Sequence, residues 1–250
     1  MKVLSVAGYH KTGKTTTVVS IIKELKKRKY KVVSIKDIHS DDFEVDKIGS
    51  NTWKHWQASK DIVVARGKNE TYLVWHRQVD LNELLLHLKA DWVIIEGMQN
   101  EALPRIVCAE NDKQLQELVD DTVIAISGKY ADNHKEFNGI KAFSVYKSEL
   151  DIIKLVDLIE EKVFDVLPLA DPKCCSECGL SCYEMVGKIL KGERKRTDCI
   201  ADSHEVAELF IDGQKIKIVP FVQRIIRDTV SSIVRNLDNC EKGSIEIKIK

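Results

Sequence analysis

A glycine-rich segment near the amino end has the residue types and the spacing that bind phosphate. Its residues are Gly8-Tyr9-His10-Lys11-Thr12-Gly13-Lys14-Thr15-Thr16. Glycines let the backbone curl until successive amide N–H groups face an anion, and a helix that follows adds the positive end of its dipole. Lys14 offers a charge to the outer phosphates, and Thr15 offers a hydroxyl to Mg²⁺. We therefore predict a loop that binds a nucleoside triphosphate; the alternative is a plain glycine turn between a strand and a helix.

Two carboxylates follow apolar runs typical of strands, and both could reach a metal ion beside Thr15. Asp37 follows the run at 32–36, and Glu96 ends the run that starts at Trp92. Ligands of a doubly wound sheet bind outside the carboxyl ends of its strands. Asp37 and Glu96 therefore join Lys14 as candidate catalytic groups, with Thr15 and Glu96 as the predicted Mg²⁺ ligands. The alternative role of each carboxylate is to cap the turn that follows it.

The residues near the loop leave the base and the reaction open. The usual guanine signature, Asn-Lys-x-Asp, does not follow the apolar run at 122–126, so the residues alone do not choose between GTP and ATP. Phosphoryl transfer depends mainly on positioning and charge stabilisation, so slow hydrolysis is the expected activity unless a partner completes the site. Lys11, Lys36 and His39 are further groups near the loop.

Five of the seven cysteines lie in a short segment that has the spacing of a metal centre. The four candidate ligands are Cys175, Cys178, Cys182 and Cys199. An apolar helical face at 185–190 would cover the centre, and Gly192 would end that helix. A [4Fe-4S] cluster fits four thiolates in this pattern, and Zn²⁺ or unligated thiols are the alternatives. Cys174 is a possible substitute ligand, whereas Cys108 and Cys240 are interpreted as packing residues or free thiols.

Strand patterns alternate with helix patterns over the first two thirds of the chain. The predicted strands are at 2–7, 31–36, 61–65, 92–95 and 122–126, and the predicted helices are at 14–28, 50–58, 80–89, 112–119 and 148–163. Such alternation predicts an α/β fold, a doubly wound and mostly parallel sheet like that of P-loop NTPases. The run at 70–77 lies too close to 61–65 for a helical crossover, so these two runs are predicted to form a hairpin.

The pattern changes near residue 166, where two of the four prolines precede the cysteines. We predict two domains, a P-loop domain at 1–165 and a cysteine-rich module with a small α+β segment at 166–250. In the second, apolar runs flank Asp212-Gly213 and predict a hairpin, a helix follows from about 221 to 237, and alternation at 245–249 predicts a last strand.

Charge and composition restrict the partners. The chain of 250 residues has 39 Lys and Arg against 39 Asp and Glu, so it has no overall field to attract nucleic acid or anionic lipid. It contains no apolar stretch long enough to cross a membrane and no basic leader, so we expect a cytoplasmic protein that binds neither nucleic acid nor membrane. Cysteines in that reducing compartment are metal ligands or thiols rather than disulfides.

Several segments together resemble the molybdopterin-guanine dinucleotide biosynthesis protein B (MobB) family over about residues 1–165. They are the loop at 8–16, Ile35-Lys36-Asp37-Ile38-His39, the segment 43–58, Asp91-Trp92-Val93-Ile94-Ile95-Glu96-Gly97-Met98 and Leu103-Pro104-Arg105-Ile106. The resemblance implies a GTP-binding, weakly hydrolysing homodimer that assists molybdopterin guanylyltransferase, the enzyme that joins GMP to molybdopterin, or other molybdoenzyme maturation proteins. The cysteine segment is similar to the small [4Fe-4S] domain of corrinoid iron-sulfur proteins.

Two functions are compatible with these features. The first is a GTP-binding accessory protein of molybdenum or tungsten cofactor biosynthesis with an added [4Fe-4S] module. The second is an electron-transfer or metal-delivery protein in which the nucleotide acts as a conformational switch, because a terminal phosphate and Mg²⁺ can order loops.

Overall fold

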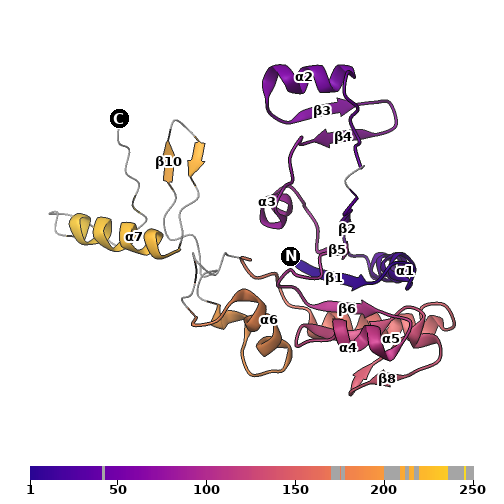
Figure 1. Ribbon diagram of the computed structural model, residues 1–250. Helices are drawn as coiled ribbons and strands as arrows, with labels where there is room; N and C mark the ends of the chain where they lie inside the picture. The colour runs from indigo at the N-terminus through magenta and orange to yellow at the C-terminus, as the bar shows by residue number, and fades with distance from the viewer. Residues whose placement is uncertain are drawn as a thin grey trace.

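A five-stranded, fully parallel sheet forms the centre of the computed structural model (Figure 1). The structure describes residues 1–40, 43–169, 175, 178–199, 209–211, 214–216, 220–235 and 245. The strand order is β2-β5-β1-β6-β7. The strands are β1 (Lys2–Gly8), β2 (Val32–Lys36), β5 (Trp92–Glu96), β6 (Arg105–Cys108) and β7 (Val123–Ser127). The register aligns Val6 with Glu96 and Gly8 with Cys108, so the carboxyl ends meet along one edge. The predicted α/β fold with a mostly parallel sheet is confirmed.

Alternating side chains of the strands build two cores, one on each face of the sheet. Leu4, Val6 and Ile94 belong to the first core, where α1 (Lys14–Lys27) and α5 (Glu149–Lys162) pack. Val3 and Val93 face the other way, toward α3 (Leu81–Leu86). A third cluster joins Val107 of β6 and Ile126 of β7 to Leu115 of α4 (Asp112–Leu118). Helices therefore cover both faces and fix the edge where the strands end.

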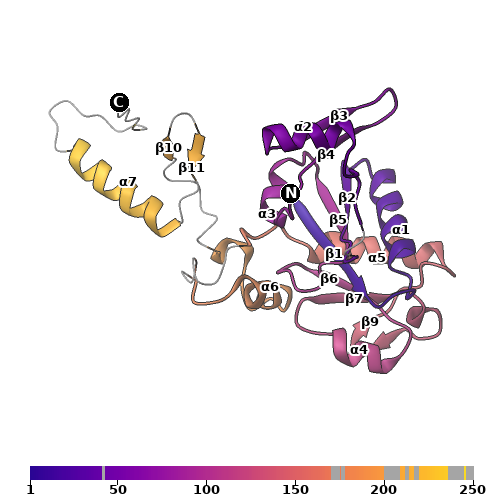
Figure 2. The same ribbon diagram turned by 45° about the horizontal axis from the view of Figure 1, so that its top comes forward.

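The predicted hairpin forms, but it lies outside the central sheet. β3 (Val63–Arg66) pairs antiparallel with β4 (Thr71–Val74), and the two make a separate sheet beside α2 (Asn51–Ser59). Figures 1 and 2 show α2 and this hairpin together, away from the central strands. The central sheet instead includes β6, a short strand that the sequence pattern did not predict. A second small hairpin joins β8 (Glu136–Phe137) and β9 (Ile140–Lys141).

The carboxy-terminal elements follow the predicted order. α6 (Cys182–Leu190) begins with a capping box of Ser181 and Glu184, and Gly192 follows it with a φ of +76°. The hairpin of β10 (Leu209–Ile211) and β11 (Gln214–Ile216) precedes α7 (Pro220–Arg235). The predicted strand at 245–249 lies outside the described residues except for Ile245. The helices that the structure describes are all too short or too polar to span a membrane.

Contacts cross the proposed domain boundary at residue 166. Met185 and Val186 of α6 share a buried cluster with Leu167, and Ala102 and Phe164 of the first segment pack against it. An added Cβ at Gly187 would lie 2.7 Å from the Cβ of Asp121, so α6 rests directly on the segment between α4 and β7. The cysteine-rich segment therefore packs against residues 1–165 near the amino ends of β6 and β7, and the division into two domains stays a prediction.

Candidate functional site

The loop between β1 and α1 is held against β6 and β7 by glycines. Gly8 has a φ of +146°, and an added Cβ there would lie 2.1 Å from the carbonyl oxygen of Cys108. Gly128, after β7, has a φ of +73°, and an added Cβ there would lie 2.2 Å from the carbonyl oxygen of Thr12. The Lys129 amide donates to that same oxygen over 3.1 Å. Only glycine permits these close approaches, so the sheet edge fixes the curve of the loop.

The start of α1 differs from the starts of α2 to α6. Each of those helices begins with a Ser, Asp or Asn side chain that accepts a hydrogen bond from an amide of its first turn. α1 instead begins after Gly13, which has a φ of +106° and caps nothing with a side chain, and its first turn, like that of α2, contains no acidic residue. Its first amides and the positive end of its dipole are therefore arranged for an external anion, which fits the predicted phosphates.

Lys14 closes over the loop. Its ammonium donates to the carbonyl oxygen of Gly8 over 2.8 Å and to that of Tyr9. The hydroxyl of buried Thr12 donates to the Tyr9 carbonyl over 2.9 Å. These bonds hold the curl of the backbone and keep a positive charge where outer phosphates would lie.

The other predicted loop residues differ in where their side chains point. The Tyr9 hydroxyl donates to Glu117 of α4, and the Tyr146 hydroxyl donates to Thr16 over 3.2 Å. The Tyr9 hydroxyl is thus engaged by α4, whereas the Thr16 hydroxyl accepts a bond and can still donate one. Lys11 is exposed, with a φ of +62°.

Thr15 and Glu96 meet at the carboxyl end of β5. The Thr15 hydroxyl donates to Oε1 of Glu96 over 2.9 Å, and the Lys36 ammonium lies 2.5 Å from the same oxygen. Glu96 is 8% exposed. A hydroxyl and a carboxylate side by side are the donors that Mg²⁺ uses beside nucleotide phosphates. The predicted pair therefore fits the ion, and Lys36 supplies a compensating charge that faces the same carboxylate.

Asp37 lies one step further from the loop. Its amide donates to the carbonyl oxygen of Glu96 over 2.9 Å, which continues the pairing of β2 with β5. Its carboxylate accepts a bond from the Met98 amide over 3.3 Å and lies 3.1 Å from Nε2 of His39. Asp37 thus holds the turn after β5 rather than the turn that follows Asp37 itself, and its catalytic role stays a prediction.

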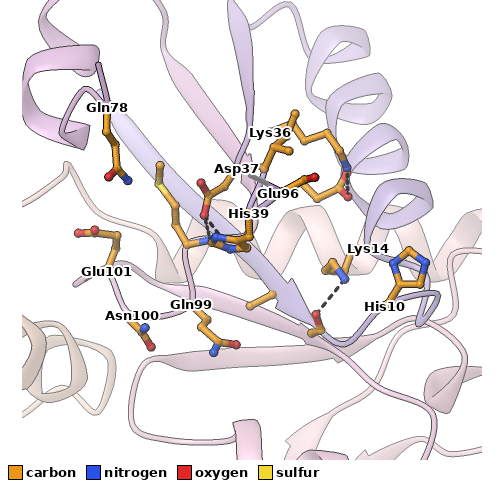
Figure 3. Close-up of a pocket in the computed structure, with 16 residues that line it drawn as sticks. His10, Lys14, Lys36, Asp37, His39, Gln78, Glu96, Gln99, Asn100 and Glu101 are labelled. Carbon is orange, nitrogen blue, oxygen red and sulfur yellow. Dashed lines mark hydrogen bonds and ion pairs between the residues drawn. The ribbon is translucent and has the colours of Figure 1, made fainter. Parts of the chain in front are cut away.

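A cavity of about 790 Å³ opens at this edge of the sheet (Figure 3). Gly8, His10 and Lys14 line one end, and Lys36, Asp37 and Glu96 line its middle. Sequence reasoning missed the residues at the far end of the cavity. Gln78 comes from the segment before α3, and Gln99, Asn100 and Glu101 come from the loop after β5. Their positions after strand ends were the available signal, but nothing in their types marks them as ligands.

The four candidate cysteine ligands lie within the described residues, and three of them gather around one cluster. Cys199 is buried beside Met185 and Val186, and Cys178 and Cys182 pack against the same cluster. Among the described residues, no group of three or more His, Cys, Asp or Glu side chains is arranged to hold a metal ion. Cys174 and Cys240 lie outside the described residues.

Cys108 stands apart from this segment. It is fully buried, and burial raises the pKa of its thiol to about 12, so it packs as a neutral group, as predicted.

The parallel sheet with a glycine-rich loop between β1 and an uncapped α1 defines a P-loop protein. The family model for molybdopterin guanine dinucleotide synthesis protein B matches residues 3–129, and the chain belongs to this family.

Relatives agree with this assignment. A Methanocaldococcus jannaschii protein, provisionally named a molybdopterin-guanine dinucleotide biosynthesis adapter protein, is 30% identical over 259 aligned positions, which cover 100% of this chain and 98% of the relative. An adapter protein of that name from Haemophilus influenzae is 30% identical over 51% of this chain and 74% of its own length. The crystal structure of Bacillus subtilis MobB superposes with a TM-score of 0.51 at 21% identity, covering 63% of this chain and 98% of that one. That likeness concerns the fold.

Proposed function

We propose that this protein is a GTP-binding adapter of molybdenum or tungsten cofactor biosynthesis that assists the attachment of GMP to molybdopterin. Family membership and the names of the relatives support a role in that pathway. The observation that carries the proposal is the uncapped start of α1 beside the Thr15–Glu96 pair, which together suit a polyphosphate and its Mg²⁺.

Each residue of the site has a role in this proposal. The backbone amides from Gly8 to Thr16 bind the phosphates, and Lys14 turns from the loop carbonyls toward the outer ones. Thr15 and Glu96 hold Mg²⁺, which when bound offsets the charge that develops on the outer phosphates. Asp37 keeps the turn after β5 in place. Guanine is favoured over adenine because the family and its relatives are named for a guanine dinucleotide.

Replacing Lys14 tests the nucleotide site. We expect Lys14→Ala to lose most of its affinity for guanylyl imidodiphosphate, because charge-assisted bonds to phosphate contribute about 1.5–3 kcal/mol each, or about a tenfold to hundredfold change in affinity. Lys23→Ala is the matched control, since Lys23 is an exposed lysine of the same helix. Calorimetry that finds equal affinity in both variants, or that finds ATP bound as tightly as GTP, would contradict the proposal.

The cysteine segment is proposed to hold a [4Fe-4S] cluster, with Zn²⁺ as the alternative. Four thiolates in this spacing, three of them around one apolar cluster, support a shared centre. We expect anaerobically purified protein to be brown and to bleach with dithionite, and Cys178→Ser to lose the metal. The matched control is Cys108→Ser, which alters a buried thiol remote from the segment. Metal analysis that finds zinc would select the alternative, and protein without metal would exclude both.

The partner and the oligomer complete the proposal. Family membership supports a partner in that pathway. We propose that this partner is molybdopterin guanylyltransferase or a molybdoenzyme maturation protein, and that the protein acts as a homodimer. Adding it to a guanylylation assay is expected to raise the rate of GMP transfer, and Lys14→Ala is expected to remove the effect. An unchanged rate with the unaltered protein would count against the adapter role.

One observation favours the second function, a nucleotide-switched electron-transfer or metal-delivery protein. Buried Arg105 contacts Tyr183 of α6 and also the carbonyl oxygen of Gln99, which lines the cavity. The cysteine segment and the cavity next to the candidate nucleotide site therefore share a partner. A reduction potential that shifts when guanylyl imidodiphosphate binds, with no effect on guanylylation, would select this function.

A further inference from the structure

The cavity continues past the place that a triphosphate would fill. In P-loop proteins the loop amides hold the inner phosphates, while the lysine and the metal lie at the outer ones. The order from the loop to the Thr15–Glu96 pair therefore runs from the inner to the outer phosphates. Figure 3 shows Gln78, Asn100 and Glu101 at the end opposite Lys14 and His10, with Asp37 and His39 between them. The far end thus lies beyond the outer phosphate.

The nucleoside has a surface on the other side of the loop. The Tyr146 hydroxyl bonds to Thr16, and an added Cβ at Gly13 would lie 2.9 Å from that hydroxyl and 3.0 Å from the Cα of Gly128. Tyr146 is 50% exposed. An exposed aromatic ring beside the inner-phosphate end suits a ribose or a base. The far end of the cavity is therefore left for another molecule.

The far end of the cavity is lined by a carboxylate and by carboxamides. Glu101 offers a carboxylate, which accepts two N–H bonds side by side, and the carboxamides of Gln78, Gln99 and Asn100 both donate and accept. Ile38 and Met98 add apolar surface to the lining. A ring with adjacent N–H and NH₂ donors next to a carbonyl acceptor, the edge of a 2-amino-4-oxopyrimidine, matches this set.

The loop that bears these groups is held in one shape. Gly97 and Met98 have φ values of +111° and +52°, and a positive φ is costly at Met98. The buried Ser5 hydroxyl donates to the Gly97 carbonyl over 2.6 Å, Met98 donates to Asp37, and Arg105 donates to the Gln99 carbonyl. Strain that is fixed from several sides is typical of ligand sites, because it orients groups before binding.

We propose that the far end of the cavity binds a second ligand with an aminopyrimidinone edge, a pterin, next to the outer phosphate of the bound nucleotide. The inference rests on the proposed function, because it takes the direction of the nucleotide from that site. The cavity of about 790 Å³ lies in the upper part of the range of about 300–1,000 Å³ for small-molecule sites. Guanine has the same edge as a pterin, so the experiment must separate the two.

Pterin fluorescence in the presence of the full chain, Mg²⁺ and saturating guanylyl imidodiphosphate tests the proposal. We expect saturable binding of pterin with the nucleotide still bound. Glu101→Gln is expected to weaken pterin binding about tenfold, as for loss of a charged hydrogen-bond partner, and to leave nucleotide affinity unchanged. Glu110→Gln is the matched control, because Glu110 pairs with Lys129 and does not line the cavity.

Three outcomes would overturn the second site. In the first, protein that binds the nucleotide does not bind pterin. In the second, Glu101→Gln binds pterin as tightly as the unaltered protein. In the third, pterin still binds in the presence of inorganic tripolyphosphate but is excluded by the guanosine analogue. The last would place guanine itself at the far end. If guanylyl imidodiphosphate does not bind, or binds Lys14→Ala as tightly as the unaltered protein, the proposed function is overturned instead. The two failures are therefore distinguishable.

Discussion

Gly8 shows how a single residue sets the shape of the candidate site. Its φ is positive and its Cα faces the Cys108 carbonyl so closely that a methyl group has no room. Gly139, in the turn between β8 and β9, also has a positive φ, of +80°, but an added Cβ there meets nothing within 4 Å. Replacing Gly139 by alanine would therefore carry only the cost of a positive φ, whereas replacing Gly8 would add the cost of a steric clash with the Cys108 carbonyl.

Alanine at these two positions is expected to give different results. Gly139→Ala should lower the free energy of unfolding by about 1–2 kcal/mol, the usual cost of a left-handed non-glycine residue. Gly8→Ala should cost more and should also weaken nucleotide binding, because the loop must move away from β6 to relieve the contact. Urea unfolding and calorimetry of both variants check this. Equal losses of stability would show that the contact at Gly8 is unimportant.

The types and the spacing of the residues predicted that Thr15 and Glu96 would lie close together, since a strand, a tight loop and a helix leave few arrangements, and the two side chains are hydrogen-bonded. They could not predict that Tyr9 turns toward Glu117 or that Thr16 bonds to Tyr146. Those orientations depend on partners more than 100 residues away in the chain. The far end of the cavity was missed for the same reason, because Gln78 and Glu101 come together only in the fold.

At the scale of elements, the contact of α6 with residues 1–165 includes a small polar network beside the apolar cluster. Tyr183 donates to Asp120 over 2.6 Å, and Arg105 contacts both. Burial opposes ionisation of Asp120, but bonds from Thr122 and Tyr183 and the charge of Arg105 outweigh it and lower the pKa of the carboxyl group. A lowered pKa means that the folded state favours the ionised carboxylate.

Asp120→Asn is therefore expected to destabilise the protein near pH 7. The contribution of Asp120 is complete above the pKa of the unfolded chain, about 3.9, and is lost as the pH falls through the lower folded-state pKa. We expect Asp120→Asn to lower the free energy of unfolding by about 1–2 kcal/mol at neutral pH. This is less than for a fully buried pair, because the Asp120 side chain is 37% exposed. Near pH 3 the two proteins should differ less in stability. Urea unfolding at both pH values measures it.

Asp121→Asn is the matched control for that substitution. Asp121 is the next residue, and its side chain is 66% exposed while it pairs with Lys191 over 2.7 Å. An exposed pair contributes about 0–1 kcal/mol. A loss in Asp121→Asn equal to that in Asp120→Asn, or a difference that persists unchanged at pH 3, would contradict the role given to the Asp120 network.

Periodicity predicted most elements to within a few residues, and it failed where tertiary contacts decide. α1 and α5 have clear apolar faces and were found at their predicted positions. β6 was missed because Arg105–Cys108 is short, follows a proline and begins with a charged residue, which is buried only because Asp120 and Tyr183 reach it. The hairpin β3–β4 was found, but no local pattern could show that it leaves the central sheet.

At the scale of the whole molecule, the β3–β4 hairpin suits the proposed homodimer. Among the described strands, β3 and β4 pair only with each other, so each has an outer edge without a strand partner. Val64, Tyr72 and Leu73 are 58%, 44% and 50% exposed on it. Exposed apolar edges favour strand pairing between chains.

Leu73→Lys is expected to shift a dimer toward monomer, because a charge on an edge strand opposes pairing. Leu86→Lys makes the same change at an 85% exposed leucine of α3, outside the hairpin, and should leave the dimer intact. Sedimentation equilibrium measures both. A dimer that persists in Leu73→Lys, or that is lost in both variants, would place the interface elsewhere.

Arg105 has a consequence for how relatives of this chain can exchange parts. Its guanidinium lies between the turn after β5 and α6, so its partners come from both sides of the proposed boundary. A hybrid that joins the first 165 residues to a foreign cysteine-rich segment without a tyrosine matching Tyr183 would leave a buried cation short of a partner. Recombination or chimera design should therefore transfer Arg105, Asp120 and Tyr183 as one unit.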